Sequence, residues 1–149
     1  MVDINGLEEL SGLLKKQLEA QKRLLELEKN KTDVLVHGDI EGLDMILKRE
    51  QALVMSSAAL EKKREALQKK NATSGMTLKE IVLTCADMDS FGLQNIFEDM
   101  SHVLTELKKT ARVNTGILNS RLVSINKFVS LLGMQKTSLT YKKDGHFEL

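Results

Sequence analysis

Residues 93–132 read LQNIFEDMSHVLTELKKTARVNTGILNSRLVSINKFVSLL, and an apolar pattern with a seven-residue period runs through the whole stretch. Two columns of side chains, offset by three or four positions, make up the pattern: Phe97, Leu104, Ala111, Leu118, Ile125 and Leu132 form one, and Leu93, Met100, Leu107, Asn114, Arg121 and Phe128 form the other. This spacing places both columns on one face of an α-helix. Such a helix is roughly 60 Å long, so its apolar face must pack on other long helices or on a partner.

The composition of the chain favours long helices. The 149 residues include no Pro and no Trp, and only 3% are aromatic. Sandwiches and doubly wound sheets need β-branched and aromatic strands, so these folds are disfavoured. A formal net charge of +1 gives no overall field that would attract nucleic acid or an anionic membrane, and no apolar run reaches the length of a membrane span. The single Cys85 and the lack of a signal-peptide pattern predict a cytoplasmic protein.

Two further long helices are expected before this one. The first should begin near Asn5, where Asn5-Gly6-Leu7-Glu8 has capping-box spacing. It should end at His37-Gly38-Asp39, because Gly suits a left-handed helix end and Asp can cap the next helix. So short a connection predicts an antiparallel hairpin. The second helix, which runs to about Lys70, repeats apolar residues every seven positions at Ile46, Leu53, Leu60 and Leu67.

A short helix should precede the last long one. Thr77-Leu78-Lys79-Glu80 is another capping box that opens a helix to about Ala86, and Asp89 or Ser90 is expected to cap the long helix. The periodicity stops after Gly133. The predicted fold is all-α: an elongated antiparallel, coiled-coil-like helical bundle of three long helices plus one short helix over residues 1–133. A mobile C-terminal tail over residues 134–149 should follow.

The sequence contains no pattern typical of an enzyme. Its three histidines are far apart and are interpreted as surface residues, and Cys85 is interpreted as a buried apolar residue. The basic run 62–70 is interpreted as a solvated helix end rather than a nucleic-acid patch. The spacing of an EF-hand calcium loop is matched in part by Asp87, Asp89, Gly92, Asn95 and Glu98, but helix capping is favoured there. We therefore predict no catalytic residue, no metal ligand and no cofactor.

The last third of the long helix is the candidate partner-binding surface. Its apolar stripe is wide, and the first two helices are interrupted by Gln and Glu, so they look too polar to cover it everywhere. A partly covered stripe beside a mobile tail suits capture of a helical segment, although burial in the bundle core is an equally open interpretation. Asn114 within the seam either fixes the register of packed helices or offers a hydrogen bond to a partner.

Three short motifs resemble the FlgN family of flagellar export chaperones. Residues 38–53, where Gly38-Asp39 leads into a Leu- and Gln-containing stretch, resemble the family's second helix. Val113-Asn114-Thr115-Gly116-Ile117-Leu118-Asn119 resembles part of its last long helix, although Ala111 stands where an earlier Asn often occurs. Thr140-Tyr141-Lys142-Lys143-Asp144-Gly145 is similar to its C-terminal Thr-Tyr-Gly-x-x-Gly signature, with Lys142 in place of the first Gly.

The resemblance implies a cytoplasmic, non-enzymatic chaperone of flagellar type III export. Such a protein would bind the C-terminal segments of the hook-associated proteins FlgK and FlgL, prevent their premature assembly, and contact the export apparatus. Nucleic acid and membrane insertion are not expected, and homo-oligomerisation is left open. The resemblance places client capture in the C-terminal part, which gives as partner-binding residues Asn114, Leu118, Leu122, Ile125, Phe128, Val129, Leu132 and Tyr141.

Two alternatives remain open from the sequence. One is a structural coiled-coil adaptor that oligomerises without an export client, and it predicts that the stripe of the last helix is buried in a self-interface. The other is a calcium- or metal-dependent sensor or enzyme, which rests only on the acidic spacing before the last helix.

Overall fold

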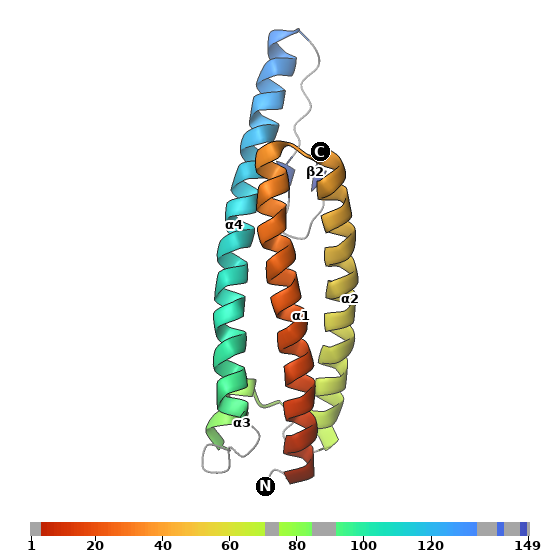
Figure 1. Cartoon of the computed structure of the whole chain (residues 1–149), viewed down its shortest axis with the longest axis vertical. Coiled ribbons are helices and arrows are strands. Elements are labelled where there is room, and N and C mark those ends of the chain that lie inside the picture. The colour runs from red at the N-terminus through yellow and green to blue at the C-terminus, as the bar shows by residue number, and fades with distance from the viewer. Residues whose placement is uncertain (1–3, 71–74, 85–91, 134–139, 142–146, 149) are drawn as a thin grey trace.

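The structure is a computed structural model, and it describes residues 4–70, 75–84, 92–133, 140–141 and 147–148. Figure 1 shows an elongated bundle of long, neighbouring helices. The described elements are α1 (Ile4–His37), α2 (Ile40–Lys70), α3 (Leu78–Thr84), α4 (Leu93–Leu131), β1 (Thr140–Tyr141) and β2 (Phe147–Glu148). The predicted antiparallel bundle of three long helices and one short helix is confirmed.

The two short strands lie within the segment predicted to be a tail. They pair antiparallel, with Thr140 opposite Glu148 and Tyr141 opposite Phe147, and β1 lies beside α4. Most of residues 134–149 lie outside the described residues, so the mobile tail and the domain boundary at 133 stay predictions.

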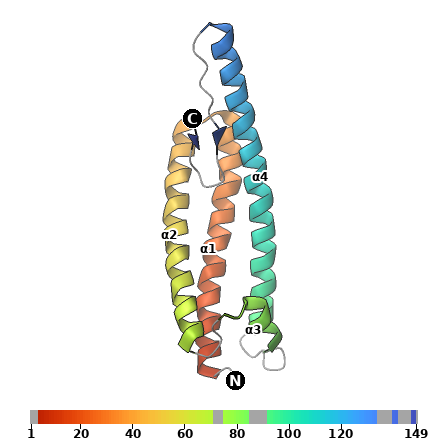
Figure 2. The ribbon, with the colours of Figure 1, turned by 180° about the vertical axis from the view of Figure 1, so that it is seen from behind.

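The central helix of the bundle is α1. It packs against both α2 and α4, whereas α2 and α4 make no comparable contact with each other in the described part of the chain. Figures 1 and 2 show the same order from opposite sides, with α1 between the other two helices. The three long helices therefore form an open array in which α2 and α4 each keep an uncovered side.

The turn between α1 and α2 follows from its sequence. Gly38 has a positive φ of 69°, which a residue with a side chain rarely adopts. The main-chain N–H of Asp39 donates to the Val34 carbonyl at 2.9 Å, and its side-chain Oδ1 accepts from the N–H of Gly42 at 2.9 Å. The predicted helix end at Gly38 and cap at Asp39 are both confirmed.

Apolar packing is concentrated near the two ends of the bundle. At the end that holds α3, buried side chains of α1, α3 and α4 form the larger cluster: Leu7, Leu10, Leu14, Ile81, Val82, Leu93 and Ile96. At the other end, Leu35 and Leu118 form a smaller cluster with Leu43 and Ile117 packed against it. The capping box that opens α3 is confirmed, since Thr77 and Glu80 each accept from the other's main-chain N–H at 3.2 Å.

The predicted helix ends differ in how they stand against the structure. The first described residue of α1 is Ile4, so the predicted start near Asn5 is confirmed to within one residue. The helix α4 begins at Leu93 with Gly92 as N-cap at a φ of 69° and no side-chain cap bond, so the predicted caps Asp89 and Ser90 are wrong. The last described residue of α3 is Thr84, and the predicted end at Ala86 lies outside the described residues, as does Cys85. None of the described helices is both long and apolar enough to cross a membrane.

Candidate functional site

The buried face of α4 shifts as the helix proceeds. Up to Asn114 the buried residues are Leu93, Ile96, Val103 and Asn114 itself, three, seven and eleven positions apart, and after Asn114 they recur every four residues at Leu118 and Leu122. An α-helix drifts by about 20° per heptad against a strict seven-residue repeat, so columns with that repeat leave the packed face. Of the two predicted columns, Leu104 is exposed before Asn114, and beyond Asn114 only Leu118 is buried.

A buried polar layer connects the three long helices at the point where this shift occurs. The Nδ2 of Asn114 on α4 donates to the Glu28 carbonyl at 2.7 Å and to Glu28 Oε1 at 3.0 Å. The hydroxyl of Thr32 donates to Asn114 Oδ1 at 2.5 Å. On the other side of α1, Lys31 Nζ lies 2.7 Å from a carboxylate oxygen of Glu50 on α2. These bonds match the register-fixing interpretation of Asn114, because they lock α4 and α2 to the same turn of α1.

The two carboxyl groups of this layer have opposite pKa shifts. Burial, reinforced by a hydrogen bond with Glu28, raises the pKa of Glu50 from 4.5 to about 7, although Lys31 acts against it. Burial would also raise the pKa of Glu28, but hydrogen bonds from Glu50 and Asn114 and the charge of Lys31 hold it below 4.5. Near neutral pH the layer thus holds an ionised Glu28 paired with Lys31, while Glu50 retains a proton for part of the time.

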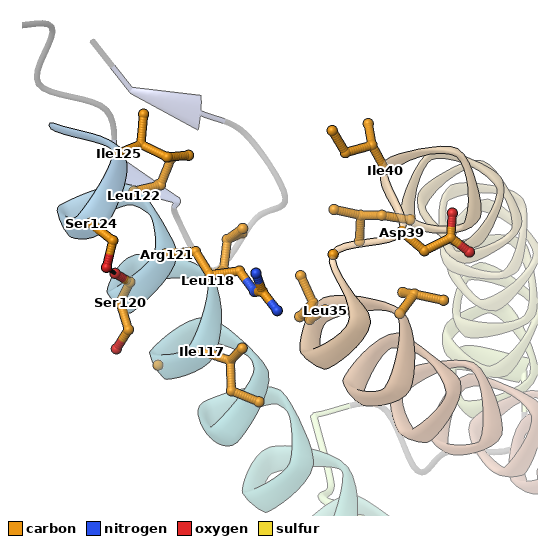
Figure 3. A pocket seen from close by; sticks show the side chains of 14 residues that line it. Leu35, Asp39, Ile40, Ile117, Leu118, Ser120, Arg121, Leu122, Ser124 and Ile125 are labelled. Atoms are coloured by element: carbon orange, nitrogen blue, oxygen red, sulfur yellow. Dashed lines mark hydrogen bonds between the residues drawn. The ribbon is translucent and has the colours of Figure 1, made fainter. Parts of the chain in front are cut away.

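Beyond the polar layer, a groove of about 830 Å³ opens between α4 and the α1–α2 turn. We call it the α4 groove (Figure 3). One wall comes from the turn and the opposite wall from α4: it is lined by Val34, Leu35, Gly38, Asp39, Ile40, Leu43, Gly116, Ile117, Leu118, Ser120, Arg121, Leu122, Ser124 and Ile125. The small apolar cluster around Leu35 and Leu118 forms its base.

A single cation connects the two walls of the groove. The Arg121 side chain extends from α4 toward the end of α1 in Figure 3, and its Nη2 donates to the Val36 carbonyl. This bond uses one of the last four carbonyls of α1, which have no partner inside their own helix. It also places the end of α1 level with Arg121, ten residues before α4 ends.

The last part of α4 therefore projects past the α1–α2 turn, as Figures 1 and 2 both show. We call residues 126–132 the α4 overhang; at 1.5 Å per residue it extends the groove wall by roughly 10 Å. Its large apolar side chains face solvent: Phe128 is 62% exposed, Leu131 86% and Leu132 59%. Exposed apolar residues this close together are typical of interaction surfaces.

The predicted partner-binding residues divide into distinct groups in the structure. Asn114, Leu118 and Leu122 are buried, and Val129 is half-buried. Ile125 lies at the rim of the α4 groove, and Phe128 and Leu132 are on the overhang. Tyr141 belongs to β1, beside α4, and its side chain is not among the described ones.

The opposite wall of the groove is not evident from the sequence pattern. Ile40 is 82% exposed there although it opens a helix, and Leu43 lies one turn further along the same wall. The sequence feature that could have indicated this wall is an isoleucine directly after a Gly-Asp turn, because the start of a helix at a turn is usually exposed to solvent. Without the pairing of α1 with α4, that signal could not be linked to the last helix.

The other candidate ligands do not form a site in the described part of the chain. His37 is exposed, with its Nδ1 2.7 Å from the Asp33 carbonyl, and His102 is exposed on α4, while His146 lies outside the described residues. Two carboxylates of the suggested calcium loop, Asp87 and Asp89, also lie outside them. Among the described residues, no group of three or more His, Cys, Asp or Glu side chains is placed to hold a metal ion.

Comparison with known proteins agrees with the resemblance noted in the sequence. The chain matches the family model described as FlgN protein over residues 1–148. A search of curated proteins and a search of solved structures each gave no match. Because the family match spans nearly the full length, the chain belongs to the FlgN family, the cytoplasmic, non-enzymatic flagellar export chaperones that bind the hook-associated proteins FlgK and FlgL and the export apparatus.

Proposed function

We propose that this chaperone holds the C-terminal helical segment of a hook-associated protein in the α4 groove and along the α4 overhang. The observation that carries the proposal is the run of exposed apolar side chains from Ile125 to Leu132, which continues directly from the rim of the groove. A client segment that is apolar on one face would cover these side chains and would be kept from pairing with other hook components.

The groove and the overhang would serve different parts of the client. Leu118 forms a fixed base because it is already packed with Leu35 near the α1–α2 turn, and Leu122, one turn further along α4, is buried as well. Ile125 and Phe128 are free to bury their side chains against a client helix. Asn114 acts indirectly in this proposal, since its hydrogen bonds hold α4 in register with α1. Tyr141 on β1 lies beside the same helix and would contribute from the tail.

Shape favours a helix as the bound form. A helix with side chains is about 10 Å across and can lie along α4 with its apolar face toward both walls. The α4 wall carries Gly116 and the small side chains Ser120 and Ser124, and a Cβ added at Gly116 meets nothing within 4 Å. Small residues let a neighbouring helix approach closely, and hydrophobic burial with few buried charges allows the client to leave during export.

The test compares two pairs of exposed apolar residues. The variant Ile125→Ser/Phe128→Ser removes apolar contact area from the proposed site, and Val54→Ser/Met55→Ser removes similar exposed side chains from α2. Binding of purified FlgK and FlgL is measured by titration calorimetry. Burying two such side chains stabilises a complex by about 3 kcal/mol, so the first variant should bind roughly 100-fold more weakly and the second should bind normally.

Two outcomes would contradict the proposal. Equal affinities for the wild type and the Ile125→Ser/Phe128→Ser variant would place the client elsewhere. A change from dimer to monomer in the same variant, seen by sedimentation without loss of FlgK binding, would mean that a second copy of the chain covers this surface. Circular dichroism of both variants should match the wild type, because all four replaced side chains are exposed.

A further inference from the structure

The charges of α4 are divided along its length. Residues 93–106 contain three carboxylates, Glu98, Asp99 and Glu106, and no Lys or Arg. Residues 107–133 contain five cations and no carboxylate: Lys108, Lys109, Arg112, Arg121 and Lys127. In α1 and α2, by contrast, both halves of the helix contain acidic as well as basic residues. The half of α4 that holds the proposed client site is therefore the only long helical stretch in the described chain with cations alone.

The helix dipole does not account for this distribution. Cations stabilise the C-terminus of a helix, but the effect falls off within the last turn. The last turn of α4 contains no basic residue, and Lys108, Lys109 and Arg112 lie about five turns or more before its end. Another cause must therefore favour cations along this half of the helix.

Apart from Arg121, which donates to the Val36 carbonyl, the described part of the chain does not account for these cations through partners of their own either. In the part of the chain that the structure describes, each ion pair lies within α1, within α2 or between these two helices. Lys48–Asp44 is an example within α2, and Lys31–Glu50 joins α1 to α2. Lys109 and Lys127 are exposed. Their positive charge is available to a carboxylate that arrives with a partner.

The position of these cations relative to the apolar surface is regular. Lys127 directly precedes Phe128, so the two side chains point about 100° apart around the helix and Lys127 flanks the exposed apolar side chains of the overhang. Lys109 lies 18 residues earlier, which is five turns, and so occupies the same flank. Charges beside an apolar seam determine which partner helix is accepted and in which direction it lies, as they do in coiled coils.

Building on the proposed function, we propose that the segment bound along α4 is an amphipathic helix with carboxylates beside its apolar face, and that Lys109 and Lys127 pair with those carboxylates. An acidic flank would complement the five cations, whereas a basic flank would meet repulsion from the whole second half of α4. The chaperone would then select its clients among apolar helices by their acidic flank.

The test uses the full-length chaperone, purified FlgK and a range of salt concentrations. The variant Lys109→Glu/Lys127→Glu, here called the flank variant, reverses the charge of the two lysines beside the apolar surface of α4. The control Lys15→Glu/Lys16→Glu reverses the charge of two exposed lysines in the first half of α1, far from the α4 groove. The affinity of the wild type should fall about tenfold between 50 and 500 mM NaCl, because salt screens flanking charges. The flank variant should bind at least tenfold more weakly at 50 mM NaCl and lose most of the salt dependence, while the Lys15/Lys16 variant should behave as the wild type.

The outcomes separate this inference from the proposed function. Suppose that Ile125→Ser/Phe128→Ser abolishes FlgK binding, while neither salt nor the flank variant changes the affinity for FlgK. The proposed client site would then be correct, and the inference of an acidic flank on the client would be wrong. If the flank variant retains FlgK binding but loses binding to vesicles of equal phosphatidylglycerol and phosphatidylcholine, the cations serve a membrane surface and the inference is overturned. Loss of FlgK binding in the flank variant, with unchanged helicity, supports it.

Discussion

Asn114 of α4 and Glu28 of α1 are joined by two hydrogen bonds from one amide group, to the main-chain carbonyl and to the side-chain carboxylate of Glu28. Both residues are buried, in a layer that separates the two apolar clusters of the bundle. The pair fixes which turn of α4 lies against which turn of α1. The position of the groove and the length of the overhang both follow from that register.

Replacing Asn114 by Ala should destabilise the bundle strongly. The change leaves the buried carboxylate of Glu28 with one donor fewer and removes the acceptor of Thr32. A lost hydrogen bond to a buried charged group, together with a small cavity, costs about 2–4 kcal/mol. Urea denaturation followed by circular dichroism measures this loss. Asn95→Ala on the exposed side of α4 is the matched control, and a similar loss there would show that any Asn of this helix is costly to replace.

The carboxyl group of Glu50 should make stability fall as pH rises. Its pKa is about 7 in the folded chain and near 4.5 when solvated, so the folded state binds more protons than the unfolded state between these values. The contribution of Glu50 is therefore fully present below about pH 4.5 and is lost as pH rises through 7. Since the side chain keeps some solvent contact, the expected loss is about 1–2 kcal/mol.

The measurement compares urea denaturation of the wild type and Glu50→Gln at pH 5, 6, 7 and 8. The stability of the wild type relative to the variant should decline over this range, because Gln cannot ionise. Glu61→Gln is a suitable control, because hydrogen bonds from Arg64 are the main reason why the pKa of Glu61 lies below 4.5. Glu61 therefore stays ionised over the whole pH range of the experiment. A relative stability that stays constant for Glu50→Gln would mean that this carboxyl is ionised at pH 5 in the folded chain.

The fold could be predicted because its determinants are local. Helical periodicity, the Gly38-Asp39 turn and the Thr77–Glu80 capping box each act within a few residues, and the structure contains all three. The start of α4 could not be predicted in the same way. Asp89 and Ser90 have the residue types that usually cap a helix, whereas α4 begins at Leu93 after a glycine with positive φ and no side-chain cap.

The candidate site was predictable only in part because exposure depends on the register between distant helices. The apolar residues from Leu118 to Leu132 were identified as one stripe, yet Leu118 and Leu122 are buried while Ile125 and Leu132 are exposed. Where α1 ends relative to α4 decides this division, and the Asn114–Glu28 pair sets that alignment. The apolar periodicity of neither helix alone predicts this alignment.

Replacing Gly38 or Gly116 by Ala should change the free energy of unfolding in opposite directions. Gly38 has a φ of +69°, so Gly38→Ala should cost about 1 kcal/mol. Gly116 lies inside α4, and a Cβ there meets nothing within 4 Å, so Gly116→Ala should stabilise the helix by about 0.5–1 kcal/mol. Thermal or urea unfolding of the two variants checks both signs. Destabilisation by Gly116→Ala would show that the backbone at this position is held away from helical geometry.

Leu122 and Ile125 are one turn apart on α4 and should separate stability from binding. Leu122 is buried, so Leu122→Ala should lower the unfolding free energy by about 2–3 kcal/mol. Ile125 is 55% exposed, so Ile125→Ala should change it by no more than about 0.5 kcal/mol and should instead weaken FlgK binding. Urea denaturation and calorimetric titration on the same two variants give both quantities. If Ile125→Ala destabilises the chain as much as Leu122→Ala does, its side chain is part of the folded core, and the surface offered to a client begins further along the overhang, at Phe128.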